Sequence, residues 1–153
     1  MNIELPKTSQ EHYLTGITAL NIPDEIDVTT GDWHMSEAFN PGFGRVPVFN
    51  LSLDYVPTND IFGTDSIREC STILKRYGYE PNDTVYSANH YRAIADMVYD
   101  DLRHEQKFEG AIILDDWLPK DEHKQRFFTF FEIAKSHLSE GQWNRYLSWK
   151  NNC

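Results

Sequence analysis

Proline and glycine interrupt the chain so often between Asn21 and Gly63 that a long helix is excluded there. These breaking residues stand at Pro23, Gly31, Pro41, Gly42, Gly44, Pro47, Pro57 and Gly63. Proline removes a backbone donor and blocks the helix interior, whereas glycine favours turns. We therefore expect a long loop region after the first helix. Loops of this length in a compact domain usually have a function or contain short ordered pieces.

One piece of this loop region has the pattern of a β-strand. Apolar side chains alternate along residues 45–53, at Val46, Val48 or Phe49, Leu51 and Leu53. Such alternation is typical of a half-buried strand, and Pro47 suits an edge strand. A second apolar run, residues 110–114, is too short for its period to distinguish a strand from a buried turn.

The rest of the chain has the periodicity of amphipathic helices. Apolar spacing and capping signals, such as the Thr8–Glu11 and Ser139–Gln142 capping boxes, predict a short last helix from Ser139 and longer helices over residues 9–20, 65–77, 87–102 and 120–137. The predicted fold class is therefore mainly α, with about five helices and a long acidic loop region. If residues 45–53 and 110–114 pair, they form a small β element and the fold class becomes α+β.

Length and composition predict one folded domain over residues 1–153. A chain of 153 residues can bury a core, and 40% hydrophobic with 14% aromatic residues is too apolar for a disordered chain. No basic region followed by an apolar run opens the sequence, and no stretch is apolar enough to cross a bilayer. We expect a cytoplasmic protein without a membrane partner, in which Cys70 and Cys153 are free thiols.

The net charge of −10 comes from 24 acidic and 14 basic residues. This balance argues against nucleic acid and anionic lipid as direct partners, because such binding depends on neutralising phosphates with Lys and Arg. Between Asn21 and Ser66, eight acids accompany a single base, Arg45. A basic protein partner therefore fits this region best.

Sequence motifs favour a binding protein over an enzyme. No two of the six histidines lie three or four residues apart, and no G-x-S-x-G elbow or phosphate-binding loop is found. No cofactor and no metal site is predicted, and the adjacent acids Asp100–Asp101 and Asp115–Asp116 are interpreted as solvated charge at helix ends. One enzymatic alternative stays open, a metal-assisted hydrolase that uses Asp32, His34 and His90.

Residues 29–36, Thr-Thr-Gly-Asp-Trp-His-Met-Ser, place a carboxylate, an indole and an imidazole side by side. One interpretation is structural, with a turn at Gly31, a cap at Asp32 and a buried ring at Trp33. The other is a recognition patch, in which carboxylates steer a basic partner and aromatic rings anchor it. The residues predicted to bind the partner are Asp24, Glu25, Asp27, Asp32, Trp33, His34, Glu37 and Phe39.

Three strings, Gly31–His34 (GDWH), Ile67–Cys70 (IREC) and Ala88–Ile94 (ANHYRAI), resemble those of small bacterial and mobile-element proteins of the antitoxin type. The resemblance covers residues 12–118 and carries over no catalytic residue. It implies a protein that neutralises a more basic partner, such as a toxin acting on nucleic acid. An immunity protein, or a phage-encoded inhibitor of a host defence nuclease, is an alternative with the same features. A recognition helix rich in Lys and Arg, which DNA-binding antitoxins use, is missing.

Overall fold

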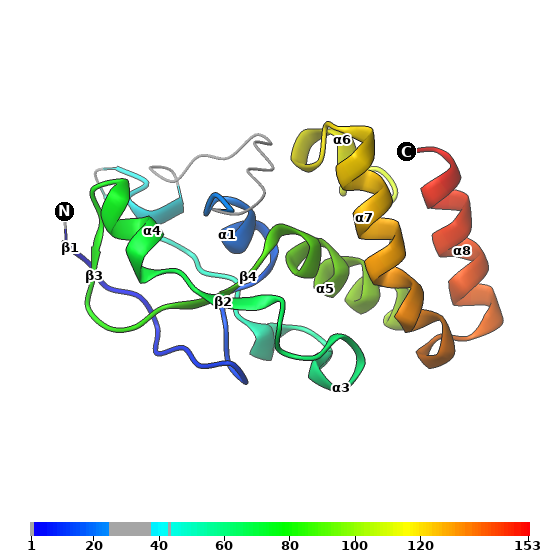
Figure 1. The fold of residues 1–153 in the computed structure, drawn as a ribbon, viewed down its shortest axis with the longest axis horizontal. Coiled ribbons are helices and arrows are strands. Elements are labelled where there is room, and N and C mark those ends of the chain that lie inside the picture. Colours follow the sequence, from blue (N-terminus) through cyan, green and yellow to red (C-terminus); the bar gives the residue numbers. More distant parts are fainter. Residues whose placement is uncertain (1, 25–37, 43) are drawn as a thin grey trace.

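The computed structural model describes residues 2–24, 38–42 and 44–153. In chain order its elements are β1 (Asn2–Ile3), α1 (Gly16–Leu20), the 3-10 helix η1 (Ser52–Asp54), α3 (Asn59–Phe62), β2 (Ile67–Glu69), α4 (Ser71–Arg76), β3 (Glu80–Pro81), β4 (Tyr86–Ala88), α5 (His90–Arg103), α6 (Leu114–Trp117), α7 (Asp121–Phe131), the 3-10 helix η2 (Glu132–His137) and α8 (Glu140–Asn151). The longest helices belong to the C-terminal half (Figure 1). The mainly α class with a small β element is confirmed.

The C-terminal half is a helical layer in which α7 and α8 lie side by side and both contact α5 (Figure 1). Aromatic rings fill the space between these helices, and the ring centroids of Phe131 and Tyr146 are 4.5 Å apart. The predicted capping box at the start of α8 is confirmed, because Ser139 and Gln142 each accept a backbone hydrogen bond from the other. The predicted helix over 120–137 is α-helical up to Phe131 and continues as η2.

The β structure consists of two short two-stranded sheets. Strand β1 pairs in parallel with β3, and β2 pairs antiparallel with β4, where Ile67 lies opposite Ala88. The pairing of residues 45–53 with 110–114, on which an α+β class depended, does not occur, because the two sheets use other segments. The first segment has only an isolated bridge from Leu51 to Leu14 and the turn of η1, and the second leads through a turn into α6.

Two hydrophobic clusters share the interior, and neighbouring residues of extended segments point into different clusters. Tyr13 belongs to the larger cluster, among the helices, whereas Leu14 belongs to the smaller cluster around α4. An extended backbone sends successive side chains to opposite sides, which a helix cannot do. This is why the predicted helix over 9–20 is wrong before Gly16. Thr8, predicted to cap that helix, instead accepts a hydrogen bond from the amide of Tyr86 at 2.8 Å.

The predicted helix over 65–77 is divided for the same reason. Ile67 packs in the larger cluster and Cys70 in the smaller one, so β2 precedes the short helix α4. Burial raises the pKa of the Cys70 thiol to about 12, and the thiol is free as predicted. The helix predicted over 87–102 is confirmed from His90 onward as α5, whereas Ser87 and Ala88 belong to β4. Asn89 caps α5 by accepting a hydrogen bond from the amide of Arg92.

An ion pair between Arg92 and Asp96 lies in the interior, one turn apart on α5. Arg92 is 0% and Asp96 1% exposed, and Arg92 Nε donates to Asp96 Oδ1 over 3.1 Å. The other guanidinium donors bond to Tyr13, Thr58, Asn59, Gly63 and Ser66. Asp96 also accepts hydrogen bonds from the hydroxyl groups of Tyr13, Thr15 and Thr58. The network compensates both buried charges and ties the N-terminal segment and α3 to α5.

Replacing Arg92 by methionine is expected to destabilise the fold by about 3–5 kcal/mol, because Asp96 would stay buried without its counter-ion. Urea unfolding measured by circular dichroism tests this. Arg103→Met, which removes an exposed guanidinium from the same helix, is the control and should cost less than about 1 kcal/mol. Equal losses for the two variants would contradict the role assigned to the network.

Candidate functional site

Two of the eight residues predicted to bind a partner, Asp24 and Phe39, fall within the described residues. The other six lie outside them: Glu25, Asp27, Asp32, Trp33, His34 and Glu37. Phe39 is 4% exposed and packs in the smaller cluster, with its ring centroid 5.9 Å from that of Phe49. Phe39 is therefore a core residue, which corrects its prediction as an exposed anchor.

Asp24 is also buried, at 6% exposure. Its Oδ1 lies 2.9 Å from Arg68 Nη2, and its Oδ2 accepts the backbone N–H of His90 over 3.2 Å. Arg68 further donates to the carbonyl oxygen of Pro23. The guanidinium thus compensates the carboxylate, and the prediction of Asp24 as an exposed steering charge is corrected. The IREC and ANHYRAI strings meet at this carboxylate.

His90 is 1% exposed, and its Nε2 lies 2.7 Å from the carbonyl oxygen of Ile22. This ring nitrogen is therefore turned toward a backbone acceptor. Asp32 and His34, the other residues of the predicted hydrolase site, lie outside the described residues. Within residues 2–24, 38–42 and 44–153, no group of three or more His, Cys, Asp or Glu could hold a metal ion.

A different set of carboxylates gathers around the C-terminal end of α5. We call Asp54, Asp100, Asp101 and Glu105 the acidic face. Asp100 Oδ1 accepts the backbone N–H of Val56 over 2.8 Å, which holds the residues after η1 against α5. The pKa of Tyr55 is raised to about 12, first by burial and then by the carboxylates of Asp100, Asp54, Asp96 and Asp101. The carboxylates of Asp54, Asp100 and Asp101 therefore all act on the Tyr55 hydroxyl, while Arg103 lies in the same last turn of α5.

The position of these acids is unfavourable for folding. Asp100 and Asp101 lie in the last turn of α5, where the helix dipole is negative and favours cations. Burial and the neighbouring charge of Asp100 raise the pKa of Asp101, although Arg145 and His104 act in the opposite direction. An acid whose pKa is raised in the fold destabilises that fold at neutral pH.

Glu105 follows the C-cap residue His104 and has a φ of 56°. This left-handed conformation costs a residue with a Cβ atom about 1–2 kcal/mol, and glycine is the usual residue here. The side chain of Glu105 is exposed. A glutamate at this position therefore adds surface charge at the expense of stability.

Glu105→Gly is expected to raise the free energy of unfolding by about 1 kcal/mol, because glycine adopts the left-handed conformation without a Cβ clash. Urea titration against the wild-type chain measures this gain. Glu105→Ala is the matched control, since it removes the same charge but keeps the Cβ atom, and it should recover less stability. A destabilised Glu105→Gly chain would show that the carboxylate contributes to the fold.

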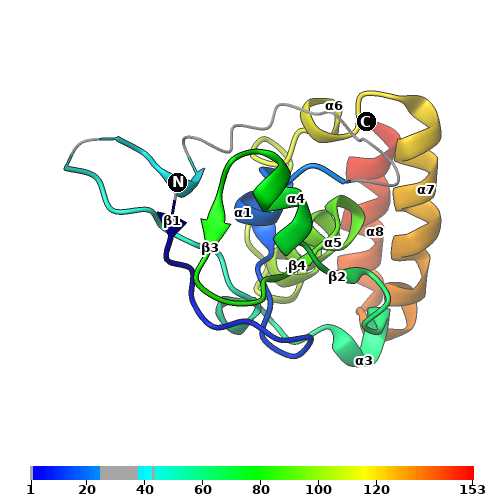
Figure 2. The ribbon, with the colours of Figure 1, turned by 60° about the vertical axis from the view of Figure 1, so that its left-hand side comes forward.

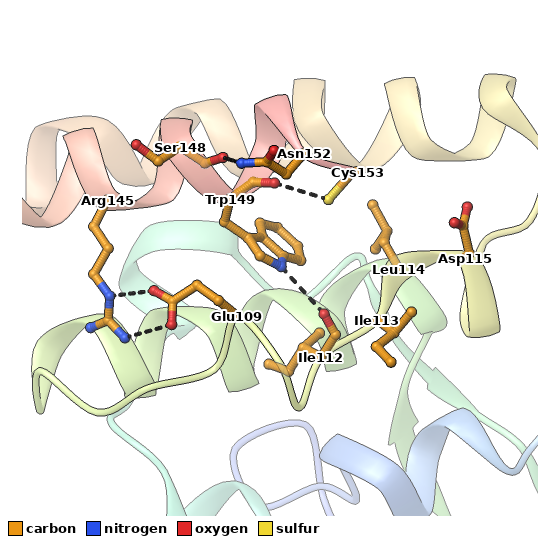
Figure 3. Close-up of a pocket in the computed structure, with 10 residues that line it drawn as sticks. All are labelled: Glu109, Ile112, Ile113, Leu114, Asp115, Arg145, Ser148, Trp149, Asn152 and Cys153. Carbon is orange, nitrogen blue, oxygen red and sulfur yellow. Dashed lines mark hydrogen bonds and ion pairs between the residues drawn. The ribbon is translucent and has the colours of Figure 1, made fainter.

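A pocket of about 300 Å³ lies between the loop before α6 and the C-terminal half of α8 (Figure 3). Its walls are Glu109, Ile112, Ile113, Leu114, Asp115, Arg145, Ser148, Trp149, Asn152 and Cys153. Trp149 Nε1 donates to the Ile112 carbonyl oxygen over 3.3 Å, which fixes the indole against the loop.

Arg145 connects this pocket with the acidic face. Its guanidinium donates to both carboxylate oxygens of Glu109 (Figure 3). Hydrogen bonding to Glu109, and then the charges of Glu109, Asp101 and Glu105, raise the pKa of Arg145. The hydrogen bond from Arg145 lowers the pKa of Glu109 to about 2. The pocket therefore combines apolar walls with an ionised rim.

The thiol in this pocket is not activated. Cys153 Sγ lies 3.3 Å from the backbone carbonyl oxygen of Trp149. Burial, and then the carboxylate of Asp115, raise the pKa of Cys153, so the thiol stays protonated near neutral pH. The pocket is at the small end of the range for ligand sites and suits one apolar side chain of a partner.

Removing the guanidinium of Arg145 should weaken the fold in a pH-dependent way. The pKa of Glu109 is lowered from 4.5 to about 2, so the pair stabilises the fold above pH 4.5 and loses this effect as the pH falls toward 2. Because both side chains are partly exposed, Arg145→Met should cost less than about 1 kcal/mol at pH 7. The free energy of unfolding, measured at several pH values, tests this loss of stability, and Lys107→Met at an exposed residue is the control. A deficit that grows on acidification would contradict this assignment.

Comparison of the chain with models of protein families, with curated proteins and with solved structures gives no match. Among the described residues, no helix has both the length and the apolar character needed to cross a bilayer.

The acidic face was not predicted as a site. From the sequence alone, Asp100–Asp101 are interpreted as solvated charge at a helix end. A usable signal was nevertheless present, because acids at the C-terminal end of a predicted helix oppose its dipole. Asp54 could not be added from the sequence, since only the fold brings η1 next to α5.

Proposed function

We propose that this protein binds and neutralises a more basic protein, in the manner of an antitoxin, through the acidic face and the adjoining pocket. The main support is that the charge of Asp101 and the left-handed backbone conformation of Glu105 both lower stability at positions that carry an acid. Residues that weaken a fold without an evident structural gain are expected at functional sites.

The two parts of the surface have complementary roles in this proposal. The carboxylates at the end of α5 attract and orient a cationic surface, which increases the association rate. The pocket beside Trp149 receives an apolar side chain of the partner, and such buried anchors supply most of the affinity in protein complexes. Exposed Ile113, at 49%, extends the apolar wall at the mouth of the pocket.

A basic partner of this kind is a toxin that acts on nucleic acid, whose cationic binding groove an acidic surface would cover. An immunity protein, or a phage-encoded inhibitor of a host defence nuclease, would use the same contact, and the identity of the partner separates these classes. Some sequence-predicted contact residues remain in the proposal as additional contacts: Glu25, Asp27, Asp32, Trp33, His34 and Glu37.

Affinity capture from the native host, followed by mass spectrometry, identifies the partner, and titration of the purified partner then tests the surface. Asp101→Asn/Glu105→Gln should weaken binding by about tenfold at low salt, mainly through slower association. The same variant should protect less well in an assay of the partner's toxicity.

Glu80→Gln/Asp83→Asn is the matched control, because it removes the same amount of charge from exposed residues around β3. Figure 1 shows β3 at the opposite end of the molecule from α8. The control should bind like the wild-type chain. An equal effect of the two double variants, or a partner without a basic surface, would refute the proposed contact.

A further inference from the structure

Residues 44–50 form an arm that projects from the body of the molecule beyond β1 and β3 (Figure 2). Val46 is 83% and Val48 82% exposed. These two exposed valines, separated by Pro47, lie on a projecting segment. Folded proteins usually protect an exposed apolar edge of this kind. This arm is separate from the acidic face and the pocket.

The backbone of the arm is open on one edge. Closer to the body, Thr15 N donates to Asn50 O and Ser52 N donates to Tyr13 O, as in an antiparallel ladder. This ladder cannot continue toward the tip of the arm, because the chain turns into α1 at Gly16. Among the hydrogen bonds of the described residues, none uses the backbone of Val46 or Val48.

We propose that two copies of this chain pair through their arms, antiparallel, about a two-fold axis at Pro47. The sequence Val46-Pro47-Val48 is symmetric about its proline. In this register Val46 lies opposite Val48 of the second copy, and such a pair exchanges both backbone hydrogen bonds. The two prolines then face each other at a non-hydrogen-bonded position, where the missing N–H of proline is not needed.

Pro47 also explains why the pairing closes at two chains. In the proposed register, the backbone of Pro47 is directed away from the second copy, toward the outer edge, where proline offers no donor to a further strand. The result is a two-fold dimer, in which each copy uses the same surface, and not an open fibre.

The charge of the chain favours this place for self-association. Each copy has a net charge of −10, so two copies repel each other over most of their surfaces. Arg45 is the single base between Asn21 and Ser66, and it directly precedes Val46 of the paired segment. The axis thus passes through the least acidic part of this region.

Site-specific crosslinking tests this register. In a Cys153→Ser background, Pro47→Cys would place two Cα atoms about 4.5 Å apart, within the range of a disulfide. Leu53→Cys, at a residue that is 68% exposed in the same region, is the matched control. We expect the covalent dimer to form at least about tenfold faster with Pro47→Cys, because the paired arms raise the effective concentration of the thiols.

Sedimentation of the unmodified chain over a range of concentrations provides the second measurement. We expect a monomer–dimer equilibrium that Val48→Pro shifts to monomer, because this variant removes an N–H at each of the two valine pairs. Circular dichroism verifies that Val48→Pro is folded. Asp101→Asn/Glu105→Gln should leave dimerisation unchanged, so the dimer and the proposed function fail or succeed independently.

In the sedimentation and crosslinking measurements, two results would overturn the proposal. One is a monomer at every concentration, with equal crosslinking rates for Pro47→Cys and Leu53→Cys. The other is a dimer that Val48→Pro leaves intact, which would place the interface elsewhere. Protection of the Val46 and Val48 amides that appears only with a foreign strand would likewise assign the arm to a different occupant.

Discussion

The buried pair of Arg92 and Asp96 is the interaction on which the rest of the structure depends. A planar guanidinium has donors in fixed directions, so its partners must come to it in a fixed arrangement. Here those partners come from the N-terminal segment, from α3 and from the residues after α3. One side chain of α5 therefore holds together segments that are far apart in sequence and that lack a long sheet or helix of their own.

This arrangement makes α5 the central helix of the larger hydrophobic cluster, to which all its buried apolar residues belong. Helices α7 and α8 pack on it, and strand β4, which pairs with β2, leads into it. Residues before α5 alternate between the clusters, as Val85 and Ala88 show by packing in the smaller and the larger cluster. The acidic face lies at the far end of the same helix, and its position thus depends on the same network.

Much of the helical half could be predicted from the sequence, because long amphipathic helices follow a local periodicity. The start of α8 at Ser139 and the apolar face of α5 are examples. The N-terminal half could not be predicted in this way, because the apolar pattern that includes Tyr13 and Leu14 is also compatible with a helix. This segment is extended because its neighbouring side chains pack in two different hydrophobic clusters. Those clusters are formed by residues that are distant in the sequence.

The same distinction applies to the candidate site. The sequence shows an excess of acidic residues, and the predicted site was located by counting these acids along residues 21–66. Asp24 is in that count and is compensated by Arg68, whereas Asp101 and Glu105 are outside it. Spatial charge depends on which carboxylates have counter-ions, and Arg68 is 44 positions away from Asp24 in the sequence.

The distribution of aromatic residues has a spectroscopic consequence. The described tryptophans, Trp117, Trp143 and Trp149, all belong to the helical half and pack in or against the larger cluster, whereas the rings of the smaller cluster are phenylalanine and tyrosine. Indole emission from these residues therefore reports on one side of the molecule. Loosening of the strands around α4 alone would leave that signal unchanged, and amide exchange is the method that would detect it.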